Sequence, residues 1–212
     1  MRIIVLAFIL VLTSCSTNTV KKDTFQNEKY EQEYLDLVEK LNSNSDLEKF
    51  IRIRNVYVKT KLYQPYFGSD ILLDGAIFEA LKEKDWPKCI EHANKLLTSN
   101  YTSLVAHYAL LVCYKETEKL RLAADHNNLL DGFIESIWAT GDGKTMKTAF
   151  QTISTSELRA FIQLQGLNIV RQSLIRDKNG VYDLMTVKRS DDDEEFNLYF
   201  NITQQMSKGF GQ

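Results

Sequence analysis

The chain has 212 residues, and 26 basic against 28 acidic side chains give it a formal net charge of −2. This balance excludes the basic excess by which a nucleic-acid-binding domain is recognised, so we expect no nucleic-acid partner. The one long apolar run, residues 3–12, has ten residues, whereas a membrane-spanning helix needs about 20, so no transmembrane helix is expected.

The apolar run follows Arg2 and ends in Leu12-Thr13-Ser14-Cys15. A basic residue before a short apolar segment is typical of a secretory signal. The last four residues resemble the lipobox of bacterial lipoproteins, in which a lipid is attached to the cysteine and the signal is cut just before it. The resemblance implies that Cys15 is lipidated and that the Ser14–Cys15 bond is cleaved. A cleaved signal with an incidental cysteine, or an uncleaved anchor, is the alternative.

This resemblance divides the N-terminal region into a signal peptide, 1–14, and a lipidated cysteine with a flexible tether, 15–27, which shows no apolar repeat. Lipoproteins of this type carry three acyl chains, and because one chain alone binds only marginally, three imply lasting attachment to a membrane. Ser16 stands where an aspartate favours the inner membrane in enterobacterial lipoproteins, and no acidic run follows Cys15. We therefore expect a cell-envelope protein in the outer membrane that faces the periplasm.

Residues 28–140 have the apolar spacing of α-helices. A first helix places four apolar residues on one face: Tyr34, Leu37, Val38 and Leu41. The sequence SDLE at 45–48 matches a capping box, in which serine is followed three residues later by glutamate. It predicts a second helix that continues to about residue 62 and has Arg54 within its apolar stripe.

Residues 70–137 resemble tetratricopeptide repeats, with helices expected at 71–83, 104–115 and 120–138 and a further helix that carries Cys89. Four residues match the consensus types of that family: Trp86, Cys89, Leu110 and Tyr114. Three depart from it: Lys84 in place of the turn glycine, Tyr101 in place of the closing proline, and Leu111 in place of a small residue. The resemblance implies one full degenerate repeat and most of another, capped by the neighbouring elements.

In tetratricopeptide proteins the first helices of successive repeats line a groove for an extended or helical peptide. The corresponding positions in this chain are Ile71, Asp74, Phe78, Val105, Tyr108 and Val112. The alternative is that these residues are buried against neighbouring helices or the C-terminal region, because helical apolar stripes are usually core. The resemblance predicts a protein partner of unknown identity in this groove.

Two further cysteines, Cys89 and Cys113, lie on apolar faces of predicted helices. An oxidising compartment permits a disulfide between them. Their positions favour two small core residues instead, and the sequence leaves the pairing open.

Residues 141–212 change to a small α+β region. We expect a strand at 148–153, a short helix that ends at Gly166, and strands at 169–176 and 181–188 joined by a tight turn at Asn179-Gly180. Strict alternation of apolar and polar residues over 196–202 predicts a last, half-buried strand. The fold class is α+β, with tetratricopeptide-like helical hairpins followed by a small antiparallel-sheet unit.

The sequence GDGKT at 141–145 is similar to the end of a phosphate-binding loop. The first glycine of that loop would stand at Trp138, and here a helix precedes the motif and a strand follows it, the reverse of the required order. We therefore expect no nucleotide site, and we interpret Gly141 as a helix C-cap and Asp142-Gly143 as a turn.

Other residue patterns give no site. The acidic run at 190–195 (SDDDEE) lacks the spaced ligands and glycine of a calcium loop. The histidines at 92, 107 and 126 are not at zinc-ligand spacing, and no nucleophile motif occurs. The sequence predicts no catalytic residue, no metal and no cofactor.

Several stretches together resemble one of the domain-of-unknown-function families of Bacteroidetes lipoproteins: YQPYFGSD at 63–70, GDGKT with TAF at 148–150, YDLM at 182–185 and LYFNI at 198–202. The resemblance covers most of the mature chain and implies a natural unit with a periplasmic address. It implies no activity. We expect a non-catalytic, membrane-anchored interaction or scaffold module. The alternatives are an immunity or inhibitor lipoprotein against a periplasm-acting toxin or hydrolase, and an enzyme of envelope polymers that pairs carboxylates such as Asp142 and Asp183.

Overall fold

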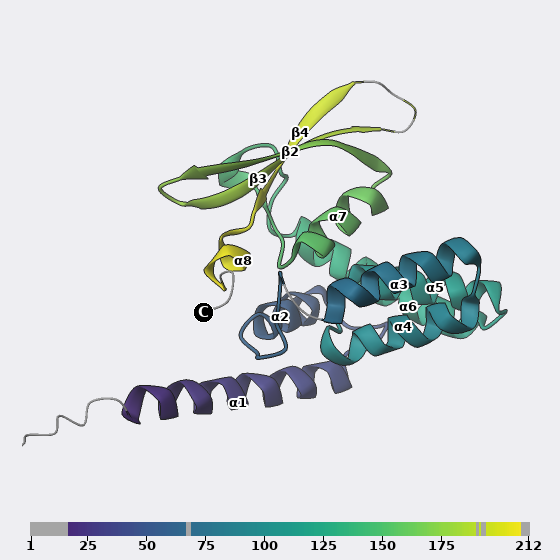
Figure 1. The fold of residues 1–212 in the computed structure, drawn as a ribbon, viewed down its shortest axis with the longest axis horizontal. Helices are drawn as coiled ribbons and strands as arrows, with labels where there is room; N and C mark the ends of the chain where they lie inside the picture. The colour runs from purple at the N-terminus through teal and green to yellow at the C-terminus, as the bar shows by residue number, and fades with distance from the viewer. Residues whose placement is uncertain (1–16, 67–68, 190, 192–193, 209–212) are drawn as a thin grey trace, which may run out of the picture.

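A computed structural model describes residues 17–66, 69–189, 191 and 194–208. The fold is α+β, as the sequence predicts (Figure 1). The helices are α1 (Thr17–Lys40), α2 (Leu47–Tyr57), α3 (Ser69–Glu83), α4 (Trp86–Ser99), α5 (Leu104–Glu116), α6 (Leu120–Trp138), α7 (Thr155–Leu164) and α8 (Thr203–Ser207). The strands are β1 (Phe150–Gln151), β2 (Leu167–Asp177), β3 (Gly180–Arg189) and β4 (Glu195–Asn201). The predicted lipidation and cleavage residues, Ser14 and Cys15, lie outside the described residues.

Consecutive helices from α3 to α6 pack against each other, and α2 packs against α1 and α6. The bounds of α3, α5 and α6 confirm the helices expected from apolar periodicity. In Figure 1, α7 lies between this helical part and the sheet. One continuous cluster of buried residues includes members from the helices and from the sheet, among them Phe50, Leu110, Phe161 and Phe200.

The turns after α3 and after α5 have the same backbone conformation. Lys84 and Glu118 are the two non-glycine residues with positive φ in the described chain, at 59° and 58°. They stand 34 positions apart, and the residue after each donates its N–H to a carbonyl five positions earlier, Asp85 to Ala80 and Lys119 to Tyr114. This left-handed conformation normally favours glycine. The helical hairpins α3–α4 and α5–α6 therefore repeat one local geometry at a fixed spacing.

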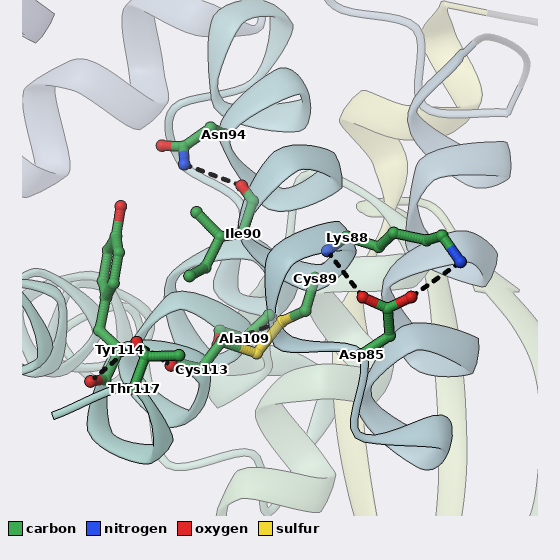
Figure 2. Close-up of a disulfide and its surroundings, with 9 residues drawn as sticks. All are labelled: Asp85, Lys88, Cys89, Ile90, Asn94, Ala109, Cys113, Tyr114 and Thr117. Atoms are coloured by element: carbon green, nitrogen blue, oxygen red, sulfur yellow. Dashed lines mark hydrogen bonds and ion pairs between the residues drawn. A yellow bond between two sulfur atoms is a disulfide. The ribbon is translucent and has the colours of Figure 1, made fainter. Parts of the chain in front are cut away.

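Cys89 on α4 and Cys113 on α5 form a disulfide, although the sequence favours two unpaired core cysteines (Figure 2). The reason is that α4 and α5 pack side by side and bring the two Cα atoms to 6.6 Å. Both residues are fully buried. Closing a loop of this length stabilises a folded chain by about 3 kcal/mol.

The sheet has the strand order β1-β4-β3-β2. β2, β3 and β4 form the predicted antiparallel meander, but β1 pairs parallel with β4, so the expectation of a purely antiparallel sheet is wrong. The strand expected at 148–153 is reduced to Phe150–Gln151, and its expected start, Thr148, belongs instead to a 3-10 turn.

The turn between β2 and β3 is placed one residue before the predicted Asn-Gly pair. Asp177 pairs with Gly180 across the ladder, so Lys178 and Asn179 form the loop, and neither Asn179 nor Gly180 has positive φ. The Asp177 carboxylate accepts from both the Asn179 and the Gly180 N–H. A Cβ at position 180 would meet the hydroxyl of Thr203, so a larger residue there would need that side chain to shift.

Two predicted helix starts also differ. The N-cap of α2 is Asp46, whose carboxylate accepts from the Lys49 N–H, and the expected cap Ser45 instead accepts from the Asn42 N–H. The helix α1 begins at Thr17, within the segment expected to be a flexible tether. Periodicity gives no signal there, because a polar stretch can be helical without an apolar stripe.

Candidate functional site

A groove runs between α3 and α5 on one side and α7 on the other. It consists of two adjoining hollows of about 380 and 300 Å³. The hollows share four lining residues, Phe78, Val105, Ala160 and Gln163, so they form one continuous depression. We call it the α7 groove.

The α7 groove contains most of the residues that the sequence predicts for a partner-binding face. Five of the six line it: Ile71, Asp74, Phe78, Val105 and Tyr108. Val112 does not, because it lies one helical turn further along α5, beyond the part of that helix that borders the groove. The alternative expectation applies to Val105, which is buried and forms the floor with Leu104.

Three large apolar side chains stand at the rim of the groove and remain open to solvent. Ile71 is 53% exposed, Phe78 is 51% exposed and Tyr108 is 40% exposed. A bound molecule could therefore bury further apolar surface of each of these side chains. Because burial of apolar surface contributes about 25 cal/mol per Å², such residues are where an occupant gains affinity.

The second wall, α7, is predicted as a helix but its place at the groove is not. Ser154 caps it by accepting from the Glu157 N–H, and its apolar face, including Leu158 and Phe161, enters the core. The opposite face carries Ser156, Arg159, Ala160 and Gln163, at helical spacing, and it lines the groove. The sequence feature that could have indicated a place at the groove is this face of polar and small residues, opposite the apolar face of the helix.

Asp74 has the least usual environment in the groove. The Ser156 hydroxyl donates to its Oδ2 across 2.6 Å, whereas Oδ1 is shielded from solvent and has no hydrogen-bond partner. Burial raises the pKa of this carboxyl from 3.8 to about 6, opposed by the Ser156 hydrogen bond and reinforced by the negative charge of Asp70. Asp74 forms no ion pair with any residue that the structure describes.

The one cationic side chain that lines this part of the groove is directed elsewhere. Arg159 Nη2 donates to Gln172 Oε1 on β2, at 3.2 Å. The positive charge of Arg159 also lowers the pKa of Asp183 on β3, against the larger, raising effect of burial. The Arg159 guanidinium therefore interacts with the sheet, through Gln172 and Asp183, and does not neutralise the charge of Asp74.

A further hollow of about 430 Å³ lies between α2, α6, β1 and α8. Its charged lining residue, Arg54, is already fully engaged. Its Nε and Nη2 donate to the two carboxylate oxygens of Glu157, Nη1 donates to Ser136, and Nη2 also donates to the Gln151 carbonyl. This hollow offers no unpaired charge to a ligand from that arginine.

The GDGKT segment is a turn, but its details differ from expectation. The C-cap of α6 is Ala139 rather than Gly141. Gly143 has φ 68°, which confirms the turn, and a Cβ there would strike the Phe150 ring. The N–H groups of Asp142 and Gly143 both donate to the Thr148 carbonyl, and the Gly143 carbonyl accepts from Tyr199 on β4. These groups attach the loop to the sheet.

The two carboxylates considered for catalysis, Asp142 and Asp183, do not share any hollow described above. Asp142 is exposed, and a hydrogen bond from Thr148 holds its pKa below the usual value. Asp183 is buried on β3, where desolvation raises its pKa. Neither lines a hollow described above, so the structure does not support their pairing.

Two histidines form a contact that their sequence spacing did not reveal. His107 Nε2 lies 2.8 Å from the Tyr101 carbonyl, and because a carbonyl only accepts, this nitrogen carries the proton. His107 Nδ1 then accepts from His126 Nδ1 at 3.0 Å. Burial lowers the pKa of His107 to about 3 and also lowers that of His126. Within the described residues no group of three metal-ligating side chains occurs, and the acidic run at 190–195 lies partly outside them.

Within the part of the chain that the structure covers, no helix combines the length and the apolar character needed to cross a bilayer. Residues 18–209 match the sequence profile of a family described as a domain of unknown function, DUF4919. Comparison with curated proteins and with solved structures gives no significant match. The chain therefore belongs to the DUF4919 family.

Proposed function

We propose that this DUF4919 member is a lipid-anchored protein of the bacterial cell envelope that acts as a protein-interaction module without catalysis. The α7 groove holds a short segment of its partner. The observation that carries this proposal is the groove itself, in which three large apolar side chains, Ile71, Phe78 and Tyr108, stay half exposed along one continuous depression. Grooves of this kind bind amphipathic or extended peptides through spaced apolar anchors.

The disulfide supports the envelope location. Cys89 and Cys113 are joined between α4 and α5, as Figure 2 shows. Disulfides persist in oxidising compartments such as the periplasm and are rare in the cytosol. The lipobox-like residues that end in Cys15 point to the same export route. We place the protein on the outer membrane, facing the periplasm.

The spacing of the helical turns supports the tetratricopeptide likeness. Lys84 and Glu118 adopt the same left-handed conformation 34 positions apart, and 34 residues is the length of that repeat. Lys84 stands where the repeat consensus has glycine. In a tetratricopeptide array the first helices of successive hairpins, here α3 and α5, face the ligand, and both line the α7 groove.

The test of the groove uses the lipid-anchored protein in its own envelope. A photo-crosslinking phenylalanine analogue at position 78 or 108 is expected to capture one partner, and the same analogue at position 72 is not. Leu72 is the matched control, because it is 77% exposed on the same helix α3 but lines neither hollow.

Phe78→Glu and Tyr108→Glu are expected to reduce capture at the other position at least tenfold, whereas Leu72→Glu leaves it unchanged. Because Phe78 and Tyr108 are exposed, each change should alter the free energy of unfolding by no more than about 0.5 kcal/mol. Equal capture at positions 72 and 78 would contradict the proposal, as would unfolding of both groove variants. If the captured partner is a toxin or hydrolase that the protein neutralises, the role is that of an immunity or inhibitor lipoprotein.

The anchor has its own test. Cys15→Ala removes the thiol that a lipid requires, so we expect loss of acyl labelling and release of the protein from the membrane fraction. Leu72→Ala is the control, since it changes an exposed side chain outside the lipobox and leaves the Cys89–Cys113 disulfide intact. Membrane association that survives Cys15→Ala would show that the lipid anchor is not the attachment.

A further inference from the structure

The carboxylate of Asp74 is more than a structural link between α3 and α7. Among the residues that the structure describes, its one hydrogen bond comes from the Ser156 hydroxyl, and an amide oxygen of asparagine could accept that bond equally well. The negative charge is therefore not needed to hold α7 in place. Burial raises the pKa of this carboxyl and leaves Oδ1 without a donor. Such a group is expected where a ligand supplies what the protein lacks.

The surroundings define what that ligand must offer. Asp70 adds negative charge near Asp74, and the guanidinium of Arg159 is bound to Gln172 on the sheet side of α7. This end of the groove thus has one carboxylate without a counter-charge among apolar surfaces. Charge complementarity calls for a cation.

The hydrogen bonding narrows the type of cation. Oδ2 is occupied by Ser156, so one carboxylate oxygen is left to accept. A guanidinium binds best to both oxygens of a carboxylate at once, whereas an ammonium group is a compact donor that needs only one. Oδ1 is shielded from solvent, so the Asp74 side chain, which lines the groove, must change its torsions and turn its carboxylate toward the ammonium when the segment binds.

The neighbours of Asp74 on α3 set the pattern of the occupant. Ile71 and Phe78 precede and follow it at helical spacing on the face that lines the groove. Their positions are separated by about 10 Å along the helix axis. A bound segment therefore meets an apolar surface, then the carboxylate, then a second apolar surface.

We propose that the α7 groove recognises a partner segment in which a lysine stands between two apolar residues, with the lysine ammonium bound to Asp74. This inference rests on the proposed function, because it names the occupant of the same groove. The apolar contact area comes from Ile71, Phe78 and Tyr108. Asp74 determines the specificity for a lysine at the central position of the segment. A segment with glutamate or with an uncharged residue at the central position is bound more weakly.

The test begins with a displayed library of random 12-residue peptides selected on the full folded protein. Peptides retained by the wild-type protein but not by Phe78→Glu are expected to carry a lysine flanked by apolar residues. Purely apolar groove-dependent peptides would overturn the lysine inference and leave the groove intact. Absence of any peptide that depends on Phe78 would overturn the groove and the inference together.

A selected peptide is then compared with a synthetic version in which norleucine replaces the lysine. Norleucine should weaken binding to the wild-type protein at least tenfold, measured by fluorescence anisotropy. With Asp74→Asn, the lysine and norleucine peptides should bind equally, because the neutral amide keeps the Ser156 bond but has no charge. Glu79→Gln is the control, since it removes one negative charge from an exposed position on the same helix outside the groove. A lysine preference that survives Asp74→Asn and falls with Glu79→Gln would overturn the assignment.

The pH dependence of the wild-type protein gives a readout that needs no variant. Burial raises the pKa of Asp74 to about 6. The charged groups near it are Asp70 on α3 and Arg159 on α7, whose guanidinium is bound to Gln172. A bound ammonium favours the ionised carboxyl, so affinity for the lysine peptide should fall up to tenfold per pH unit below about 6. Affinity for the norleucine peptide should stay nearly constant. Parallel curves for the two peptides would contradict the proposal.

Discussion

Helix α7 is attached to the helical part of the molecule on both of its sides, and the two attachments differ. On one side, Glu157 enters the core, and its two carboxylate oxygens accept from Arg54 and from the Ile153 N–H. On the other side, the adjacent Ser156 reaches a carboxylate, Asp74, that has one oxygen without a partner. The first attachment is complete, as expected of a structural link, and the second is incomplete, as expected of a binding site.

This difference shows why burial alone does not identify a functional residue. Glu157 is the more deeply buried of the two acids, with 5% of its surface exposed. Every acceptor oxygen of its side chain is nevertheless engaged, and a guanidinium balances its charge. Asp74 is less buried but has neither a second donor nor a counter-charge. The state of the hydrogen bonds, more than the depth of the side chain, separates the structural role of Glu157 from the binding role that we propose for Asp74.

The largest change in the free energy of unfolding is expected when the Arg54–Glu157 ion pair is broken. Arg54→Met leaves the Glu157 carboxylate buried without its counter-charge and should lower the free energy of unfolding by about 3–5 kcal/mol. Urea unfolding monitored by circular dichroism measures this loss. The double variant with Glu157→Leu should recover much of it, because no buried charge then remains. A loss below about 1 kcal/mol for Arg54→Met would break the comparison, because the complete attachment would then not be structural.

At Asp74, removal of the charge is expected to raise the free energy of unfolding instead of lowering it. The folded-state pKa of this carboxyl, about 6, lies above its ordinary value of 3.8, so the protonated form is favoured by folding. The stabilisation is fully present below pH 3.8 and is lost as pH rises through 6. Asp74→Asn has no such loss and should be more stable than the wild type by about 1–3 kcal/mol at pH 7.5. The two proteins should be nearly equal at pH 4.

Urea unfolding of both proteins at the two pH values checks this prediction, because titrating groups that do not interact with Asp74 cancel in the difference. A gain in stability together with loss of lysine-peptide binding would sharpen the comparison, since it would show a binding residue that costs stability. A destabilised Asp74→Asn at pH 7.5 would instead make Asp74 a second structural link.

The smallest effect is expected at the repeated turns, which stand apart from both attachments. Lys84 and Glu118 are held at positive φ, where a Cβ is unfavourable. Lys84→Gly and Glu118→Gly should each stabilise the protein by about 0.5–1 kcal/mol in thermal unfolding, without a change in peptide binding. A change in peptide affinity would mean that the turn geometry controls the α7 groove.

Local patterns were enough to predict most of the helices and the two hairpin-linked strands. Apolar spacing identified α3, α5 and α6 because each buries one stripe, and a register resemblance placed Phe78 and Tyr108 on the groove. Both inferences depend on residues only a few positions apart in the sequence. The alternation of apolar and polar residues over 196–202 is also a local pattern, and it indicates a strand with one buried face.

The attachments of α7 depend on distant residues and have no local signal. Arg54 meets Glu157 across 103 positions, and Ser156 meets Asp74 across 82. An arginine within the apolar stripe of α2 was a sign of a buried partner, but the sequence did not name it. The parallel pairing of β1 with β4 and the Cys89–Cys113 bond were hidden for the same reason, since each follows from packing of elements already formed.

The early start of α1 has a mechanical consequence if the chain is anchored at Cys15, as we propose. The helix begins at Thr17, two positions after Cys15, and its 24 residues extend over about 36 Å. A flexible chain of that length would allow the folded domain to take many orientations and to contact the bilayer. A helix resists compression and bending, so it restricts these positions. If a lipid is bound at Cys15, α1 acts as a post that sets the working height of the α7 groove above the membrane surface.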